Sequence, residues 1–416
     1  MYIADLHIHS KYSRATSKEC VPEYLELWAR KKGISLLGTG DFTHPAWRKE
    51  LWEKLEPAEP GLYTLKKEFQ FPEGPDAQST SVRFVVTGEI SSIYKKNGKV
   101  RKVHNLILLP SLEAAEELSR RLELIGNIHS DGRPILGLDS RDLLETALEA
   151  APEAVFIPAH IWTPHFSLFG AFSGFDSIEE CFEDLTPHIH ALETGLSSDP
   201  PMNWRISALD SYTLISNSDA HSPAKLGREA NLLETELSYS ELANAIQGRN
   251  PDGLLGTIEF FPEEGKYHYD GHRNCHLCLK PSETEQYGGR CPICGKKITI
   301  GVQHRVEQLA DRPEGFVKPN GKAFESLVPL PEVIAASTSH SPASVKVLAQ
   351  YEAMLKRLGS EFSILRETPL EEIGKAAGPC IQEGIRRLRD GQVGREPGYA
   401  GAYGVIHYME QKDIDA

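Results

Sequence analysis

Six short segments in the first 221 residues follow one plan, in which an apolar, strand-like run ends and a metal-binding side chain comes next. The segments are residues 5–9 (DLHIH), 40–44 (GDFTH), 88–89 (GE), 103–105 (VHN), 158–160 (PAH) and 218–221 (SDAH). Parallel strands buried on both faces read as continuous apolar runs, and barrel enzymes carry catalytic residues at the carboxyl ends of such strands. The pattern therefore predicts an α/β barrel with a metal centre at one end.

The residue types in these segments define the expected centre. A mixture of His, Asp and Glu without Cys suits a catalytic cluster of two or three Zn²⁺ ions, with Mn²⁺ or Mg²⁺ as alternatives. Two histidines in an H-x-H pair lie on one face of a strand, because side chains alternate. His44 stays open as an alternative ligand within its segment. The expected ligands are His7, His9, Asp41, Glu89, His104, His160, Asp219 and His221, with Asp219, His221 and Glu89 carrying catalysis.

A second metal site follows the barrel pattern. Two C-x-x-C units, with twelve residues between them, predict a structural zinc bound by Cys275, Cys278, Cys291 and Cys294. A closed tetrahedral shell of four ligands leaves no open position, so this zinc would stabilise a small module and catalyse nothing. We expect the other three cysteines to be reduced, packed thiols.

Length and hydropathy set the domain organisation. A chain of 416 residues is too long for one ordinary core. We expect a barrel over 1–250, a zinc-binding module over 251–310 and a small helical domain with a Gly/Tyr tail over 325–416. Strand residues follow Met1 directly and no apolar run has the length of a membrane span, so we expect a cytoplasmic protein without membrane contact.

Basic residues are few but clustered. The net charge of −14 opposes nucleic-acid binding only weakly, because bound cations would offset part of it. Residues 95–102 (KKNGKVRK) predict an Asn-Gly hairpin at the rim of the barrel, where Lys96, Lys99 and Arg101 can contact phosphates. A solvated strand edge is the open alternative. A second basic cluster, at residues 386–389, has the same two interpretations.

Aromatic residues gather directly after His160. Residues 161–182 carry Phe166, Phe169 and Phe172, whose rings can stack on a base or enter a duplex beside the metal centre. The alternative is a hydrophobic lid that packs on the barrel. Tyr399 and Tyr403 in the tail have a similar pair of roles, stacking on bases or anchoring the tail.

The order of these ligands resembles that of the polymerase and histidinol phosphatase (PHP) superfamily, which implies a distorted (β/α)7 barrel with a trinuclear centre over residues 1–250. Two departures concern the third ion. No histidine lies within residues 12–18, and Phe42 follows Asp41 where that superfamily has an Asp-His pair.

The full arrangement of barrel, zinc module and helical tail resembles the endonuclease Q family of DNA repair enzymes. The resemblance implies a metal-dependent endodeoxyribonuclease that hydrolyses the phosphodiester 5′ of deaminated bases (uracil, hypoxanthine, xanthine) and abasic sites with metal-activated water. A sliding-clamp partner stays open. A PHP-type phosphatase acting on a small phosphomonoester is the alternative function, and it leaves the residues after the barrel without a role.

Overall fold

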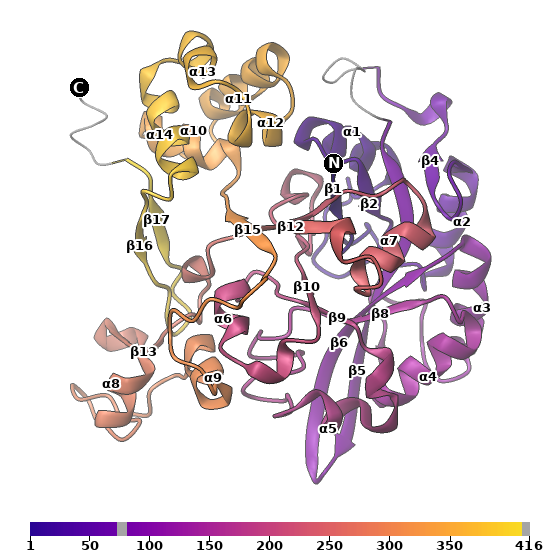
Figure 1. Cartoon of the computed structure of the whole chain (residues 1–416), viewed down its shortest axis with the longest axis horizontal. Coiled ribbons are helices and arrows are strands. Elements are labelled where there is room, and N and C mark those ends of the chain that lie inside the picture. The colour runs from indigo at the N-terminus through magenta and orange to yellow at the C-terminus, as the bar shows by residue number, and fades with distance from the viewer. Residues whose placement is uncertain (73–80, 410–416) are drawn as a thin grey trace.

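A computed structural model describes residues 1–72 and 81–409 of the chain. Strands of a mixed sheet curve into a distorted α/β barrel, which fills the right half of the view in Figure 1. β1, β2 and β5 run parallel in adjacent positions, whereas β11 pairs antiparallel with β1 and β6 pairs antiparallel with β5 and β8. The predicted α/β fold class is thus confirmed. The barrel strands are β1 Tyr2–Asp5, β2 Leu36–Gly38, β5 Arg83–Lys96, β6 Lys99–Leu109, β8 Val155–Pro158, β9 Ala191–Glu193, β10 Thr213–Ile215, β11 Ala230–Leu233 and β12 Leu254–Glu259.

Short helices connect the barrel strands, and their ends follow from local sequence. α1 begins with Pro22 in its first turn and ends at Gly33, whose φ of 89° is left-handed. The Ser111 hydroxyl caps α3 by accepting from the amide of Ala114. The barrel helices are α1 Pro22–Lys32, α2 Pro45–Lys54, α3 Leu112–Glu123, α4 Ser140–Ala150, α5 Ile178–Phe182, α6 Pro200–Trp204 and α7 Tyr239–Ile246, and three short strands are β3 Leu55–Pro57, β4 Tyr63–Leu65 and β7 Ile135–Leu136.

The predicted basic hairpin is present at the metal-centre end of the barrel. β5 continues past Glu89 to Lys96, and β6 returns from Lys99. Asn97 and Gly98 form the turn with φ values of 53° and 72°, the left-handed pair that a two-residue hairpin turn requires. The hairpin therefore projects from the barrel rim, as Figure 1 shows at its lower edge.

The barrel sheet extends beyond residue 250, where the sequence places its end. β12 pairs with β11, and β15 (Ala323–Ser326) adds a further parallel strand from the far side of the zinc-binding module. That module lies between these two strands in the chain, with β13 Asp270–His272, β14 Leu277–Leu279, α8 Pro281–Gln286 and α9 Val302–Leu309. The module is thus inserted into the barrel sheet rather than appended to it.

Helices dominate the C-terminal region. These helices are α10 Leu330–Thr338, α11 Val345–Leu358, α12 Glu361–Arg366, α13 Leu370–Ala377 and α14 Pro379–Arg389. Gly378, with a φ of 90°, separates α13 from α14. Among the described residues, no helix has the length and apolar character needed to cross a membrane.

The Gly/Tyr tail forms a hairpin that its sequence does not predict. β16 (Gly394–Glu396) pairs antiparallel with β17 (Val405–His407). Between them, the amide of Gly398 donates to the carbonyl of Glu263 at 2.7 Å, and Tyr399 bridges to Tyr269. The tail is therefore anchored on the segment that enters the zinc-binding module, and residues 410–416 lie outside the described chain.

One buried ion pair fastens the C-terminal helices to the barrel. Lys32 Nζ at the end of α1 lies 2.7 Å from Glu361 Oε2, and both side chains are only 4% exposed. The hydroxyl of Tyr351 donates to the same oxygen at 2.8 Å, and the amide of Leu330 donates to Glu361 Oε1 at 2.9 Å. The Glu361 carboxylate thus binds polar groups from three separate helices, α1, α10 and α11.

We predict that Glu361→Gln destabilises this junction by about 3–5 kcal/mol, because it leaves the buried Lys32 ammonium without a negative partner. The ring of Trp28 stacks 6.4 Å from that of Tyr351, so tryptophan fluorescence during urea unfolding reports on the junction. Glu352→Gln is the matched control, since it removes only the exposed partner of Lys31 and should cost less than about 1 kcal/mol. Equal effects of the two substitutions would contradict this role of Glu361.

Candidate metal centre

Two histidines and two carboxylates converge at the end of β1. His7 and His9 follow β1, Glu89 lies within β5, and Asp219 follows β10; one ligand atom from each lies within 4.8 Å of the others. His9 Nε2 is 3.0 Å from Asp219 Oδ1 and 3.2 Å from Glu89 Oε2. His7, His9 and Glu89 are fully buried, whereas the Asp219 side chain is 28% exposed. Access to this group is therefore on the side of Asp219.

A second ligand group shares the same glutamate. Glu89 Oε1 lies 2.7 Å from His104 Nδ1 and 2.9 Å from His160 Nε2, and the two imidazole nitrogens are 3.3 Å apart. Glu89 Oε2 faces the first group. One carboxylate thus presents one oxygen to each group, which is how a bridging ligand serves two adjacent ions.

Within the part of the chain that the structure describes, three buried atoms of the first group have no hydrogen-bond partner: His7 Nε2, His9 Nε2 and Asp219 Oδ1. Buried polar atoms are rarely left unsatisfied, and a divalent cation between them would satisfy all three. Burial lowers the pKa of each of these two histidines, but the negative charges of Glu193 and Asp41, respectively, help raise it well above its ordinary value. His7, His9 and Asp219 therefore fit a divalent cation that takes the place of protons on the two imidazoles.

The pKa values of the two histidines of the second group shift in opposite directions. Burial lowers the pKa of His160, but the hydrogen bond and charge of Glu89 raise it above its ordinary value. Burial lowers the pKa of His104 to about 4, although Glu89 opposes this shift. The imidazole is therefore neutral at physiological pH, with a lone pair free to bind a metal. Among the described residues, no third ligand group forms in the barrel.

Two further carboxylates stand behind the histidines. Both oxygens of Glu193 lie 3.0 Å from His7 Nδ1, and Asn217 Nδ2 donates to Glu193 Oε2 at 2.9 Å. The Asp41 carboxylate is 2.9 Å from His9 Nδ1. Such contacts fix the imidazole tautomer and leave Nε2 free to bind a metal. Glu193, the last residue of β9, thus lies behind His7 and orients its ring.

The structure places Asp41 behind His9 instead of among the ligands. Its second oxygen accepts from the Ser10 amide at 2.7 Å, the Ser10 hydroxyl at 2.6 Å and the Ser13 hydroxyl at 2.9 Å. With Oδ1 on His9 and Oδ2 on Ser10 and Ser13, Asp41 belongs to neither ligand group found among the described residues. His44, the alternative, is also turned away, because its Nε2 meets the His129 carbonyl and its ring stacks on Tyr12.

His221 lies beside the first group but is not part of it. Its Nδ1 is 2.8 Å from the Asp219 carbonyl, and its ring centroid is 4.5 Å from that of His9. The side chain is partly exposed, so it lines the opening next to Asp219. Phe42 is fully buried and offers no ligand.

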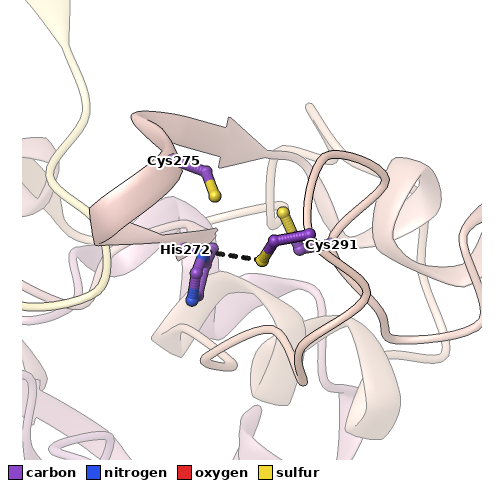
Figure 2. A group of neighbouring side chains, drawn as sticks. His272, Cys275 and Cys291 are labelled. Atoms are coloured by element: carbon purple, nitrogen blue, oxygen red, sulfur yellow. Dashed lines mark hydrogen bonds between the residues drawn. The ribbon is translucent and has the colours of Figure 1, made fainter.

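In the zinc-binding module, the ligand group is His272, Cys275, Cys291 and Cys294, whose donor atoms lie within 4.8 Å of one another. Figure 2 shows the labelled side chains of His272, Cys275 and Cys291 turned toward one another. His272 Nδ1 lies 3.6 Å from Cys294 Sγ. Cys278 is not in the group. It pairs with Gly271 across the β13–β14 hairpin, and because side chains alternate it faces away from His272. The spacing His-x-x-Cys could have revealed His272.

The aromatic segment after His160 is mostly interior. Phe169 and Phe175 are buried, and the guanidinium of Arg305 on α9 donates to both of their carbonyls, at 3.0 and 2.9 Å. Phe169 packs 5.0 Å from Trp162, so it supports the loop from the interior. Phe172 is 61% exposed and stacks on exposed His165.

Phe166 occupies a third kind of position. Its ring centroid is 4.8 Å from that of His104, and Lys102 Nζ lies 5.2 Å over the same ring. It is partly exposed, so it borders the metal centre.

Two residues of the basic hairpin are held by other parts of the protein. Lys96 pairs with Asp139 at 3.1 Å and Glu183 at 2.8 Å. Arg101 is buried, donates to the Gly174 carbonyl and lies 4.1 Å over the Phe175 ring. Lys99 remains exposed, as does Lys95. The cluster at residues 386–389 is likewise engaged, with Arg386 bound to Glu383 and Asp390.

Arg133 is a residue of the centre that sequence reasoning missed. Its Nη1 lies 3.0 Å from Glu89 Oε2. It comes from the connection between α3 and α4, outside the strand ends that identify the other residues, so no local pattern marks it.

Comparisons with known proteins cover the whole chain. Residues 329–392 match the family model described as the MJ0043 C-terminal domain. The chain is 29% identical to YqxK of Bacillus subtilis over 97% of its own length and 98% of that protein. It is 31% identical to MJ0043 of Methanocaldococcus jannaschii over 60% of its own length and 32% of that larger protein.

Two solved structures are similar along their full length. The lesion-specific endonuclease PfuEndoQ from Pyrococcus furiosus superposes with a TM-score of 0.86 at 31% identity, covering 100% of this chain and 97% of that one. An endonuclease Q complex with a 27-mer duplex bearing an abasic lesion at the active site gives a TM-score of 0.84 at 30% identity, with 100% and 98% coverage.

The geometry of the module predicts that His272→Ala loses the structural zinc and unfolds the module locally, because such an ion supplies the folding free energy of a small unit. Cys278→Ser should keep the zinc. The measurement is the amount of zinc per chain in each gel-filtered variant, determined by inductively coupled plasma mass spectrometry. Loss of zinc from Cys278→Ser with retention in His272→Ala would restore the four-cysteine set.

Proposed function

The chain belongs to the endonuclease Q family, and from this premise we propose that it is a metal-dependent DNA repair endonuclease. The observation that carries the proposal is the pair of ligand groups joined by Glu89 in a chain that matches the family from end to end. We propose that it cuts the phosphodiester 5′ of deaminated bases (uracil, hypoxanthine or xanthine) and of abasic sites. A family member bound to a duplex with an abasic lesion supports the last of these substrates.

We propose that two divalent cations, Zn²⁺ first and Mn²⁺ or Mg²⁺ as alternatives, bind in the barrel. His7, His9, Glu89 and Asp219 would hold one, and Glu89, His104 and His160 the other. Bound together, the ions would supply hydroxide near neutral pH and stabilise charge on the phosphate. A third zinc, in the module, would be structural.

The protein's own groups prepare the site for this chemistry. Glu193 and Asp41 keep the Nδ1 protons on His7 and His9, so that both Nε2 lone pairs point inward. His221 donates its Nδ1 proton to the Asp219 carbonyl, which leaves Nε2 as the free ring nitrogen at the opening. The scissile phosphate would therefore enter beside Asp219 and His221.

We propose that DNA reaches this opening across the hairpin and the aromatic segment. Exposed Lys95 and Lys99 can contact phosphates. The stacked pair of His165 and Phe172 presents aromatic faces on a loop whose base is fixed, so it can stack against bases next to an extruded nucleotide. Phe166 would lie nearest the lesion because it borders His104.

The catalytic part of the proposal predicts that Asp219→Asn lowers nicking by about two to three orders of magnitude, because the substitution removes a charged ligand. The assay is strand cleavage of a duplex with one deoxyuridine, deoxyinosine or abasic site. Asp184→Asn, which removes an exposed carboxylate paired with Arg141, is the matched control and should leave the rate unchanged. Wild-type protein that releases phosphate from histidinol phosphate but leaves every lesion duplex intact would favour the phosphatase.

The DNA path predicts two separable effects. Replacing Lys95 and Lys99 with Ala should weaken binding of damaged and undamaged duplexes alike. The slope of log affinity against log salt should fall by about 0.9 for each DNA phosphate that these lysines neutralise. Phe172→Ala should instead lower the ratio of damaged to undamaged affinity. Lys49→Ala, at an exposed lysine of α2, is the control for charge alone. Wild-type affinity and slope in the double lysine variant would remove the hairpin from the interface.

A further inference from the structure

We propose that Arg133 is a further catalytic residue, whose guanidinium binds a non-bridging oxygen of the scissile phosphate and stabilises the negative charge that develops there. This inference rests on the proposed hydrolysis of a phosphodiester. It adds to the ligand groups a cationic side chain that no strand-end pattern identifies.

The position of the guanidinium is the first support. Nη1 lies 3.0 Å from Glu89 Oε2, the oxygen that also faces His7 and His9. Within the described residues this is the one hydrogen bond that the guanidinium makes. Five N–H donors are available, so most remain for another acceptor. The side chain is 23% exposed, much as Asp219 is, so its other donors can meet a ligand at the opening.

The backbone on both sides of Arg133 is fixed against the centre. The Gly132 amide donates to the Tyr12 carbonyl at 3.0 Å, and a Cβ at position 132 would collide with the carboxylate of Asp41. On the other side, the Pro134 carbonyl accepts from the Ser91 amide at 3.0 Å, just past Glu89 in β5. The glycine thus lets this connection pack on the residues behind His9, and the guanidinium is placed before a substrate arrives.

The balance of charge is the second support. Four carboxylates contact the barrel histidines: Asp41, Glu89, Glu193 and Asp219. Two divalent cations would neutralise them, and Arg133 would then be the net positive charge of the centre. A phosphodiester brings one negative charge to this centre and a phosphomonoester dianion brings two, so the single guanidinium offsets the charge of a diester more fully.

A purely structural role for Arg133, as the counter-ion that holds Glu89, makes different predictions. In that case its removal would release metal from the barrel. If Arg133 contacts the phosphate, its removal should slow the chemical step while the ions stay bound. A planar guanidinium also binds two phosphate oxygens side by side, which a lysine cannot reproduce.

The test compares Arg133→Ala and Arg133→Lys with wild type in the full-length protein. We expect single-turnover cleavage of an abasic duplex to fall by about 10²–10³-fold in Arg133→Ala, with barrel metal per chain unchanged. Arg133→Lys should recover only part of the rate. Added guanidinium should partly rescue Arg133→Ala, and inhibition by inorganic phosphate should weaken at least about tenfold. Arg83→Ala, which breaks the half-buried pair with Glu59, is the matched control.

Two results would overturn the inference: an unchanged rate with metal intact, or metal loss from Arg133→Ala in proportion to the fall in rate. A chromogenic phosphodiester, measured in parallel, separates this inference from the proposed function. If wild type hydrolyses that diester in an Arg133-dependent way but nicks no lesion duplex, the DNA substrate is wrong and the role of Arg133 stands.

Discussion

The buried carboxylate of Glu89 is the group on which the rest of the centre depends. It lies between two ligand groups, with one oxygen toward His104 and His160 and the other toward His7 and His9. Burial alone would raise the pKa of this carboxylate, but His104, His7 and Arg133 hold it well below its ordinary value. His7 and His9 follow β1, His104 lies within β6 and His160 follows β8, so the shape of the centre depends on several barrel strands.

Sequence could identify most of this centre because an apolar run precedes each of its ligands, although Glu89 and His104 lie within β5 and β6 and not at strand ends. The H-x-H pair and Glu89 are identified by alternation and by position alone. Tertiary contacts set the direction of a side chain in a loop. The sequence therefore could not show that Asp41 points toward Ser10 and Ser13, which donate hydrogen bonds to its carboxylate. Cys278 raises a related point, since its spacing fits a zinc site while its pairing with Gly271 turns its side chain away from His272. Arg133 had no local signal.

The parts of the chain outside the barrel also shape the opening. Arg305 of the zinc-binding module fixes the aromatic segment, and β15 brings the chain back into the barrel sheet after the module. The tail then binds the segment that leads into the module. A loss of zinc would therefore also perturb the loop that carries Phe172, because Arg305 of the module holds that loop. Sequence could not show that the module is inserted into the barrel sheet.

The most direct test is a crystal structure of the zinc-loaded protein with anomalous diffraction measured at the zinc edge. We expect two anomalous peaks in the barrel that share Glu89, one toward His7 and His9 and the other toward His104 and His160. We also expect one peak within the group that contains His272. A third barrel peak bound by His221 and Asp41, or a barrel peak that does not contact Glu89, would contradict the bridging role of this carboxylate.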